Sequence, residues 1–297
     1  MRGANGFSPG FDIAGENERL AESGCRFRRD ARQGSRLRGW PLMPREHAAE
    51  FRFYDELNDF LPAERHKQTL EYGFNGHPGV KDSIEAQGIP HTEVELILVN
   101  GESVGFDHHL QDGDRVAVYP MFESFDITPL LKLRESPLRN PAFVLDVNLG
   151  KLARRLRLLG FDSLYDNTYQ DAEIADIAES EKRAVLTRDR RLLHAKRITH
   201  GYWVRSVHAD RQTEEVLRRF DLYRQINPFC RCLRCNGLLC PVAKADVLHR
   251  LEPKTRLYYE KFFMCEYCHQ IYWEGSHVGN MREMCDKYRV LGGCDEQ

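Results

Sequence analysis

The chain has 297 residues, more than one ordinary hydrophobic core needs, so we expect two or three small domains. Lys and Arg total 43 and Asp and Glu total 45, so a formal net charge of −2 excludes a global field that draws the whole molecule to nucleic acid or membrane. A hydrophobic content of 41% and a charged content of 30% exclude a wholly disordered or fibrous chain. No run approaches the roughly 18 apolar residues of a membrane span, and the N-terminus has no apolar signal core, so we expect a cytoplasmic protein without a membrane partner.

Residues 1–45 form a segment of unusual composition. They contain nine Arg and no Lys, with frequent Gly and Ser and almost no apolar periodicity. Such a segment buries too little apolar surface to offset the entropy lost on ordering, so we expect a disordered basic arm. It is either an RNA-binding tail or an extension that folding does not need, and the second interpretation is favoured.

Residues 46–122 show short alternating runs typical of strands. The runs are AEFRFYD, QTLEYGF, VELILVNGE and DRVAVYP, each bounded by Pro, Gly, Asn or Asp. Between the second and third, GVKDSIEAQG carries Val80, Ile84 and a closing Gly88, which predicts a short amphipathic helix. The order strand, strand, helix, strand, strand predicts a compact α+β domain.

This pattern, with VNGE and QDGDRVAVYP, resembles the ubiquitin-like β-grasp domains of the sulfur-carrier type. The resemblance implies chemistry at a free C-terminal Gly-Gly, but here Tyr119 is followed by PMFES and the chain continues. We therefore expect a docking role, with a protein partner, or a substrate-presenting role in place of carrier chemistry. A Pro-marked linker at 123–140 follows.

From 141 to 226, strand patterns alternate with helix patterns. AFVLDV, RAVLTRD and YWVRS read as strands, while NLGKLARRLRLLG, DAEIADIAESEK, RRLLHAK and ADRQTEEVLRRF read as helices. Strands that alternate with helices predict an α/β domain with a parallel sheet wrapped by helices.

Four acidic residues fall where such a sheet binds ligands. Asp146 and Asp189 lie at or near the ends of two predicted strands, and Asp171 and Glu173 open the intervening helix. Singly, each acid is better explained as a helix cap or strand end. Jointly, converging carboxylates favour Mg²⁺ or Mn²⁺, held by Asp146, Asp171 and Asp189. Such a metal pair can generate hydroxide and stabilise the leaving oxygen of a phosphodiester.

Basic residues lie beside these acids. They line the polar side of the first helix at Lys151, Arg154, Arg155 and Arg157, and flank Asp189 at Arg188, Arg190 and Arg191. Residues 141–226 hold sixteen Lys or Arg against thirteen Asp or Glu, so nucleic-acid binding is permitted by charge but not required by it. The candidates for substrate binding are Lys151, Arg155, Arg188 and Arg190.

Four of the cysteines after residue 227 form two spaced pairs. Cys232 and Cys235 are separated by two residues, as are Cys265 and Cys268, with twenty-nine residues between the pairs. Four thiolates with this spacing predict a tetrahedral Zn²⁺ site, which is structural because protein occupies every position. The first part of the intervening insert has a helical pattern and its end a strand pattern.

Three neighbours compete for a ligand position, and two further cysteines have no assigned role. Cys230 and Cys240 do not belong to a second pair with two-residue spacing, and His269 directly follows the last predicted ligand, Cys268. We expect a zinc module over 227–280 and a polar tail over 281–297, which contains Cys285 and Cys294.

An aromatic and polar patch follows the second pair, at Tyr272, Trp273, Ser276 and His277. It can stack on unpaired RNA bases, or its rings can pack over a module too small to have its own core. Both interpretations remain open.

Several long strings carry a family resemblance. FVLDVNLGKLARRLRLLGFDSLYDN, DAEIADIA and AVLTRDRRLL, followed by a cysteine module ending in IYWEGSH, resemble the Mut-seven C-terminal RNase family. That family has a PIN-like nuclease fold fused to a zinc ribbon, and bacterial members often carry an N-terminal ubiquitin-like domain. The resemblance implies a Mg²⁺- or Mn²⁺-dependent ribonuclease acting on RNA, with acids at Asp146, Asp171, Glu173 and Asp189. The alternative is a non-catalytic RNA- or ribosome-associated adaptor, in which the ribbon and basic helix bind and the acids are caps.

Overall fold

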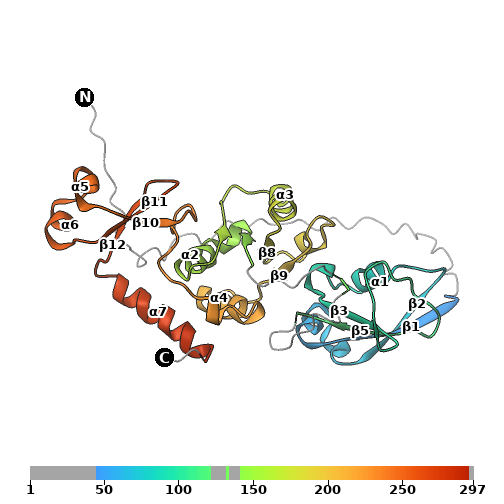
Figure 1. Ribbon diagram of the computed structural model, residues 1–297. Coiled ribbons are helices and arrows are strands. Elements are labelled where there is room, and N and C mark those ends of the chain that lie inside the picture. Colours follow the sequence, from blue (N-terminus) through green and yellow to red (C-terminus); the bar gives the residue numbers. More distant parts are fainter. Residues whose placement is uncertain (1–44, 122–131, 134–140, 294–297) are drawn as a thin grey trace, which may run out of the picture.

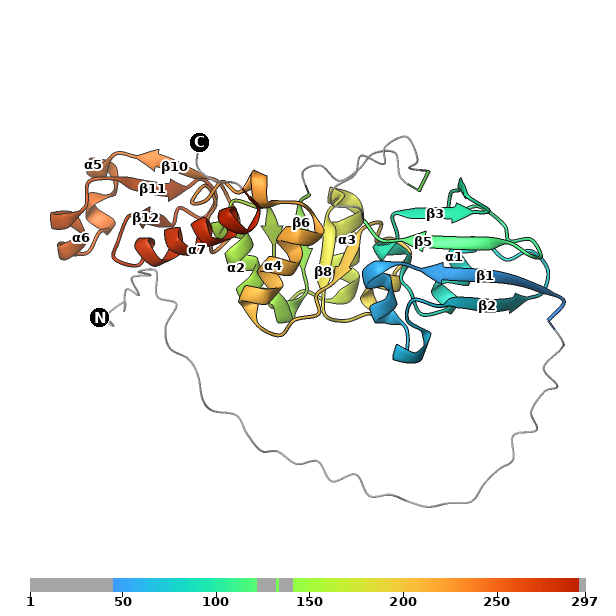
Figure 2. The ribbon, with the colours of Figure 1, turned by 90° about the horizontal axis from the view of Figure 1, so that it is seen from below.

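The computed structural model describes residues 45–121, 132–133 and 141–293. The predicted basic arm and linker therefore lie almost entirely outside the described residues. Three units follow one another in a row: an N-terminal unit, a central unit and a cysteine module (Figures 1 and 2). Within these ranges, no helix has both the length and the apolar composition that crossing a bilayer requires.

The N-terminal unit is a mixed five-stranded sheet with the order β2-β1-β5-β3-β4. Its elements are β1 (His47–Phe53), β2 (Thr69–Phe74), α1 (Val80–Ala86), β3 (Leu96–Val99), β4 (Glu102–Ser103) and β5 (Arg115–Tyr119). Alternation along β1 buries Phe51 and Phe53 and leaves Arg52 exposed, so one face of the sheet forms a core with Val80 and Ile84 of α1. The predicted α+β, ubiquitin-like domain is confirmed.

The central unit is a four-stranded parallel sheet with the order β7-β6-β8-β9. Its strands are β6 (Phe143–Leu145), β7 (Ser163–Leu164), β8 (Ala184–Thr187) and β9 (Gly201–Trp203). Its helices are α2 (Gly150–Leu158), α3 (Asp171–Glu181) and α4 (Ala209–Arg219). The predicted parallel α/β architecture is confirmed.

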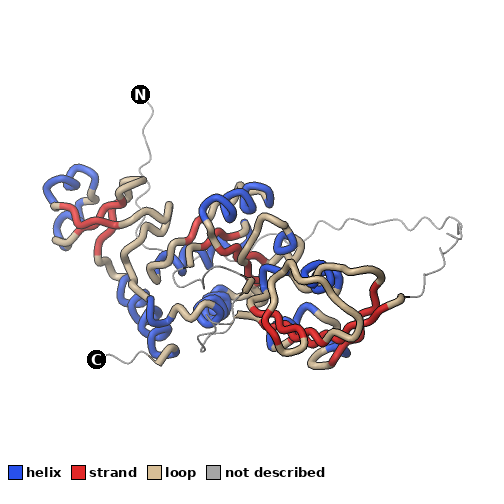
Figure 3. Tube along the Cα trace, turned by 45° about the vertical axis from the view of Figure 1, so that its right-hand side comes forward, coloured by secondary structure: helices blue, strands red, loops and turns tan. Residues whose placement is uncertain are grey.

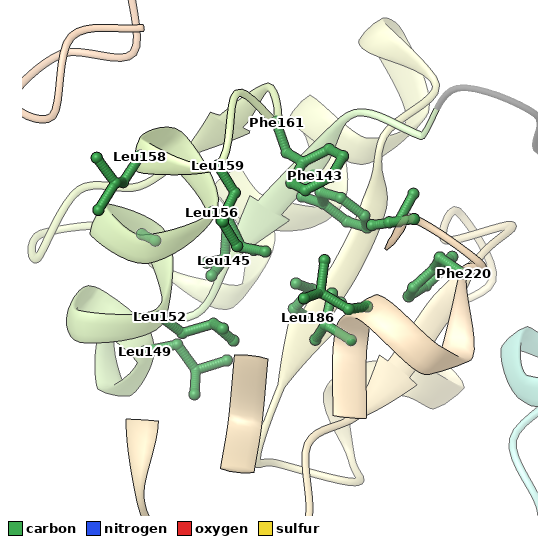
Figure 4. Packing of buried hydrophobic residues seen from close by; sticks show 14 of the residues in the cluster. Phe143, Leu145, Leu149, Leu152, Leu156, Leu158, Leu159, Phe161, Leu186 and Phe220 are labelled. Atoms are coloured by element: carbon green, nitrogen blue, oxygen red, sulfur yellow. The ribbon is translucent and has the colours of Figure 1, made fainter. Parts of the chain in front are cut away.

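Both faces of this sheet are covered, which explains its continuous apolar strands. Phe143 and Leu145 join Leu186 in one core with residues of α2 and α4 (Figure 4). Val144 and Val185 point to the other face, where they pack with residues of α3.

The C-terminal helix α7 (Val278–Leu291) occupies most of the segment that we expected to be a polar tail. That expectation is wrong, because Met281, Cys285 and Tyr288 are buried in the core of the central unit. Their spacing of four and three residues makes a single narrow apolar stripe on an otherwise charged helix. Cys294 lies outside the described residues.

The cysteine module has a three-stranded antiparallel sheet with the order β10-β11-β12 (Figure 3). Its elements are β10 (Leu239–Val242), α5 (Lys244–Val247), α6 (Pro253–Tyr258), β11 (Phe262–Cys265) and β12 (Ile271–Trp273). The insert between the cysteine pairs contains the predicted helical part and ends in the predicted strand, but it begins with strand β10, which the sequence patterns did not predict. Its small core gathers around Val247, Leu251, Phe262 and Ile271.

Candidate active site and metal centre

Two of the predicted acids are joined at one edge of the parallel sheet. Asp146 directly follows β6 and Asp189 follows β8, and the two strands are parallel neighbours, so both acids lie at the same edge. The buried hydroxyl of Thr187 donates a hydrogen bond to Oδ2 of Asp146 over 2.8 Å. Oγ1 of Thr187 in turn accepts the backbone N–H of Asp189 over 2.8 Å. Thr187 therefore fixes the carboxylate of Asp146 and the backbone of Asp189 to each other.

The other two predicted acids lie on the crossover helix α3. This helix leaves β7 and returns to β8, so its first residue, Asp171, begins on the carboxyl side of the sheet and is exposed. Glu173 accepts the backbone N–H of Gln170 over 3.1 Å and completes a capping box. The capping role at the start of α3 is thus sufficient to explain a glutamate at position 173.

Hydrogen bonds support a capping role for Asp189 but not for Asp146. Oδ1 of Asp189 accepts the N–H of Arg191 over 2.8 Å and stabilises the following turn. Asp146 precedes the 3₁₀ helix Val147–Leu149, and among the described residues its side chain makes no capping hydrogen bond there. Capping does not account for Asp146, which is only 6% exposed.

The donor chemistry of this edge suits a hard divalent cation, but the acids are not gathered into a ready-made metal site. Within the described ranges, Asp146, Asp171 and Asp189 do not bring carboxylate oxygens within 4.8 Å of one another as a group of three. The structure thus brings together Asp146 and Asp189, through Thr187, and leaves Asp171 on a separate element.

Tyr165 is a neighbour of Asp146 that the sequence patterns did not single out. Its hydroxyl donates to the carbonyl of Val147 over 3.0 Å. A Cβ at Gly150 would lie 2.7 Å from that hydroxyl, so glycine is required for the ring to pack at the start of α2. Burial raises the pKa of Tyr165, and the nearby acids Asp166 and Asp146 add to this rise.

The four cations predicted to bind substrate differ in their surroundings. Lys151 and Arg188 are exposed. Arg155 forms an ion pair with Asp210 of α4 and contacts the Tyr288 hydroxyl at 3.5 Å. Contacts inside the protein therefore already engage the guanidinium of Arg155, and substrate binding by these cations stays a prediction.

Arg190, beside Asp189, packs against the N-terminal unit. Its guanidinium carbon lies 3.7 Å from the centre of the Trp203 ring and 5.4 Å from that of Phe60. Its Nη2 donates to the carbonyl of Asp59 over 3.3 Å. The residue next to a candidate catalytic acid is thus held by the ubiquitin-like domain.

Arg157 is not on the exposed side of its helix, which corrects the sequence interpretation. It is buried, and its guanidinium donates to the carbonyls of Ser163 at 2.8 Å, Leu233 at 3.1 Å and Arg234 at 3.0 Å. Leu233 and Arg234 lie between the first two cysteines of the predicted metal site. Arg157 therefore fastens the cysteine module to the central sheet.

Asn236 makes a second link between these two units. Its amide donates to Oδ1 of Asp162 over 2.8 Å, and its oxygen accepts the N–H of Ser163 over 2.9 Å. Burial alone would raise the pKa of Asp162, but hydrogen bonds from Arg183 and Asn236 hold that pKa below its usual value. No sequence pattern pointed to these residues, because their partners are 74 and 73 positions away.

The N-terminal unit covers the edge strand β9 of the central sheet. The backbone N–H of Trp203 donates to Oε1 of Glu93 over 2.5 Å. Arg219 of α4 lies 3.6 Å from Glu93 and 2.9 Å from Glu56. Complete burial outweighs the attraction of the arginines and raises the pKa of Glu93 to about 7. This interface gives the edge strand a covering that isolated sheets lack.

Four cysteines meet in the module, as predicted. The Sγ atoms of Cys232, Cys235, Cys265 and Cys268 all lie within 4.8 Å of one another. Cys232 and Cys268 are 3.6 Å apart, and Cys235 and Cys265 are 3.4 Å apart. Sulfurs around a tetrahedral zinc with bonds of about 2.3 Å lie about 3.8 Å from each other, so the arrangement fits a metal of this kind.

The local backbone and a tyrosine shape this centre. Asn236 and His269, each directly after the second cysteine of its pair, have φ of 71° and 56°, which turns the chain sharply behind the thiols. The Tyr272 hydroxyl contacts Sγ of Cys232 at 3.1 Å. Burial would raise the pKa of Cys232, but this contact and backbone N–H groups lower it to about 7.

The competing ligands lie elsewhere. Sγ of Cys230 is 3.1 Å from the carbonyl of Asn227, and Sγ of Cys240 is 2.8 Å from Oε1 of Glu266. In the described part of the chain, neither of them nor His269 joins the four-cysteine group.

Two family models match the chain. Residues 141–285 match the family model of the Mut7-C RNAse domain, and residues 46–126 match that of the Mut7-C ubiquitin domain. The chain belongs to the Mut7-C RNAse-domain family and carries its ubiquitin-like domain. The solved structures include a similar chain, the crystal structure of SAMP1 from Haloferax volcanii, with 17% identity, a TM-score of 0.22, and coverage of 26% of this chain and 99% of that one. No curated protein matches the chain.

Proposed function

We propose that this protein is a metal-dependent ribonuclease whose active site lies at the carboxyl edge of the parallel sheet. The observation that carries the proposal is the hydrogen-bonded set Asp146–Thr187–Asp189, which lies within the segment that matches an RNAse domain. In this proposal the central unit, residues 141–226, is a PIN-like nuclease domain. The reaction is hydrolysis of an RNA phosphodiester bond.

The residues of the edge have separate roles in this proposal. Asp146 and Asp189, with Asp171, would hold Mg²⁺ or Mn²⁺, which supplies an activated water and charge stabilisation when bound. Thr187 orients the Asp146 carboxylate, and Glu173 supports the start of α3 next to Asp171. Lys151 and Arg188, both exposed, bind backbone phosphates on either side of the acids.

The cysteine module, residues 227–280, is in this proposal a zinc ribbon. Zinc suits four thiolates in this geometry, and a centre closed by four protein ligands supports the fold and not the chemistry. The hydrogen bonds of Arg157 to Leu233 and Arg234 connect the folded zinc ribbon to the nuclease unit. The protein acts in the cytoplasm, on RNA, and its ubiquitin-like domain docks a protein partner.

The test is cleavage of end-labelled RNA by the zinc-replete protein with Mn²⁺, with Mg²⁺ and with neither. The parent is compared with an Asp146→Asn/Asp189→Asn variant, which keeps the hydrogen-bonding shape but removes two charges. We expect cleavage that needs the added metal and that falls by at least about a hundredfold in the variant. Full activity of the variant would remove the acids from the mechanism.

A non-catalytic RNA adaptor is the second candidate. It is favoured by the capping bonds of Asp189 and Glu173 and by the separation of the acids into different elements. RNA binding without cleavage under every metal condition, unchanged by chelation mild enough to spare the zinc, would support it.

A further inference from the structure

A hollow lies between the cysteine module and α7, away from the acidic edge. Its volume is about 90 Å³, and Phe229, Phe263, Tyr272 and Trp273 contribute aromatic rings to its lining. We call it the ribbon pocket. All four side chains are only partly buried, so their rings remain accessible from solvent. Phe229 and Trp273 also pack against neighbouring cores, and the parts of the rings that stay accessible line a concave, mainly apolar surface of the kind that binds ligands.

The walls of the ribbon pocket are held in place by contacts already described. The Tyr272 hydroxyl contacts Cys232 and accepts the N–H of Leu233 over 3.1 Å, so the metal centre fixes this ring. Arg231 donates to the carbonyl of Gly160 over 3.1 Å and pairs with Asp162. The pocket is therefore pre-formed, and a ligand does not have to order it.

Two polar groups at the pocket form an exposed ion pair. Arg282 of α7 lies 2.7 Å from Oε1 of Glu274, and about half of each side chain is exposed. The guanidinium carbon of Arg282 lies 6.0 Å from the centre of the Phe229 ring. An exposed ion pair contributes little to stability, so a ligand can replace it with bonds of its own. The guanidinium then offers donors and the carboxylate an acceptor.

This combination matches a nucleobase, which has two apolar faces and an edge that carries donors and acceptors. Of the two guanidinium groups in the lining, that of Arg231 is already paired with Asp162, so that of Arg282 is the cation that a ligand can engage. An apolar protein side chain would make no use of the polar pair.

We propose that the ribbon pocket binds one unpaired base of the RNA. The inference rests on the proposed ribonuclease function and adds to it a second contact with the substrate. Leu158 of the pocket ends α2, whereas Asp146 lies before its start. The nine residues of α2 span about 13 Å, so the pocket and the acidic edge are separated by roughly the length of this helix. An RNA that reaches both therefore contacts the protein over several nucleotides. The protein therefore selects RNA that is single-stranded beside the cleaved bond.

The test fills the pocket instead of removing its walls. Leu239→Trp, in β10, places a larger side chain in the hollow, and Arg282→Gln removes the donor at the rim. Both are made in the full-length Asp146→Asn/Asp189→Asn background, so the RNA stays intact. The control is Arg211→Gln on α4, which makes the same charge change at a side chain that is 73% exposed. Fluorescence anisotropy measures binding of an unstructured 12-nucleotide RNA and of the same strand in a duplex.

We expect Leu239→Trp to weaken binding of the unpaired RNA about tenfold, because the base loses its stacking contacts in the pocket, and to leave duplex binding unchanged. Arg282→Gln should weaken it about threefold, and Arg211→Gln should have no effect. Zinc content and circular dichroism check the fold of each variant, and Arg282→Gln serves as the test if Leu239→Trp misfolds.

Equal affinity of the unpaired RNA for all variants would overturn the proposal, and this is also the result expected if a protein side chain fills the pocket. The outcome is separable from the nuclease test. A parent that cleaves RNA while Leu239→Trp binds it normally contradicts only the pocket. A parent that binds bases through the pocket without cleaving contradicts only the nuclease.

Discussion

The Thr187 hydroxyl donates a hydrogen bond of 2.8 Å to Asp146, and this one contact ties the ends of two neighbouring strands together. Because Thr187 also accepts the N–H of Asp189, its side chain determines how the two acids lie relative to each other. Thr187 is fully buried, so water cannot replace either bond.

Replacing Thr187 with Val keeps the shape of the side chain but removes its hydroxyl. The Asp189 N–H then loses its acceptor, so we expect the free energy of unfolding to fall by about 1–3 kcal/mol, and cleavage to fall more than stability alone explains. Urea denaturation and metal-dependent RNA cleavage measure the two effects. Thr187→Ser keeps the hydroxyl and should retain most activity. If Thr187→Val cleaves as well as the parent, Thr187 does not orient Asp146.

The two kinds of cysteine in the module should behave differently. Cys232→Ser removes a member of the four-sulfur group, so bound zinc should drop well below one per chain and the melting temperature should fall. Cys240→Ser removes an exposed thiol outside that group and should change neither. Metal analysis and thermal melting test both. Loss of zinc in Cys240→Ser, or its retention in Cys232→Ser, would contradict the ligand assignment.

Arg188 and Arg190 flank Asp189, but their replacement should affect different properties: RNA binding for Arg188 and stability for Arg190. Arg190→Ala loses the stacking on Trp203 and the bond to Asp59, so we expect a loss of about 1 kcal/mol in stability. Arg188→Ala should leave stability unchanged and weaken RNA binding. The dependence of affinity on salt concentration should also become less steep, by the amount expected for the loss of about one phosphate contact. Denaturation and salt-titrated binding compare the two. Equal effects on RNA affinity would show that Arg190 also reaches the substrate.

Glu93 makes the contact between the ubiquitin-like domain and the central sheet sensitive to pH. Its pKa is raised from 4.5 to about 7, so the folded protein holds a proton that the unfolded chain releases between these values. The free energy of unfolding should therefore fall as pH rises through this window, by on the order of 3 kcal/mol from this group.

The Glu93→Gln variant isolates this contribution, since Gln resembles the protonated side chain. Burial lowers the pKa of His91, so this residue makes stability rise with pH below pH 6.5, opposite to the effect of Glu93. His91 is present in both proteins, so the difference in stability between parent and variant reports Glu93. We expect parent and variant to differ progressively in melting temperature from pH 5 to pH 8, with the parent declining more. Parallel curves would show that Glu93 is ionised throughout.

Local patterns were sufficient for much of the fold. The period of two in AEFRFYD and the continuous apolar run of AFVLDV distinguish a half-covered sheet from a doubly covered one, and β1 and β6 confirm both. The spacing of the cysteine pairs likewise predicted the four-sulfur group. The C-terminal segment was misjudged, because the three buried residues of α7 are too few to dominate its polar composition.

The sequence alone determined which residue types stand at strand ends and in spaced pairs, since those features depend on near neighbours in the chain. Only the tertiary structure decided which of them meet. Arg157 looks like an exposed cation in the sequence yet is buried and bonded to the cysteine module, whereas Arg190 is exposed but stacks on Trp203 and bonds to Asp59. Their partners are distant in sequence, and the free energy of burying a guanidinium depends on how completely those partners satisfy its donors.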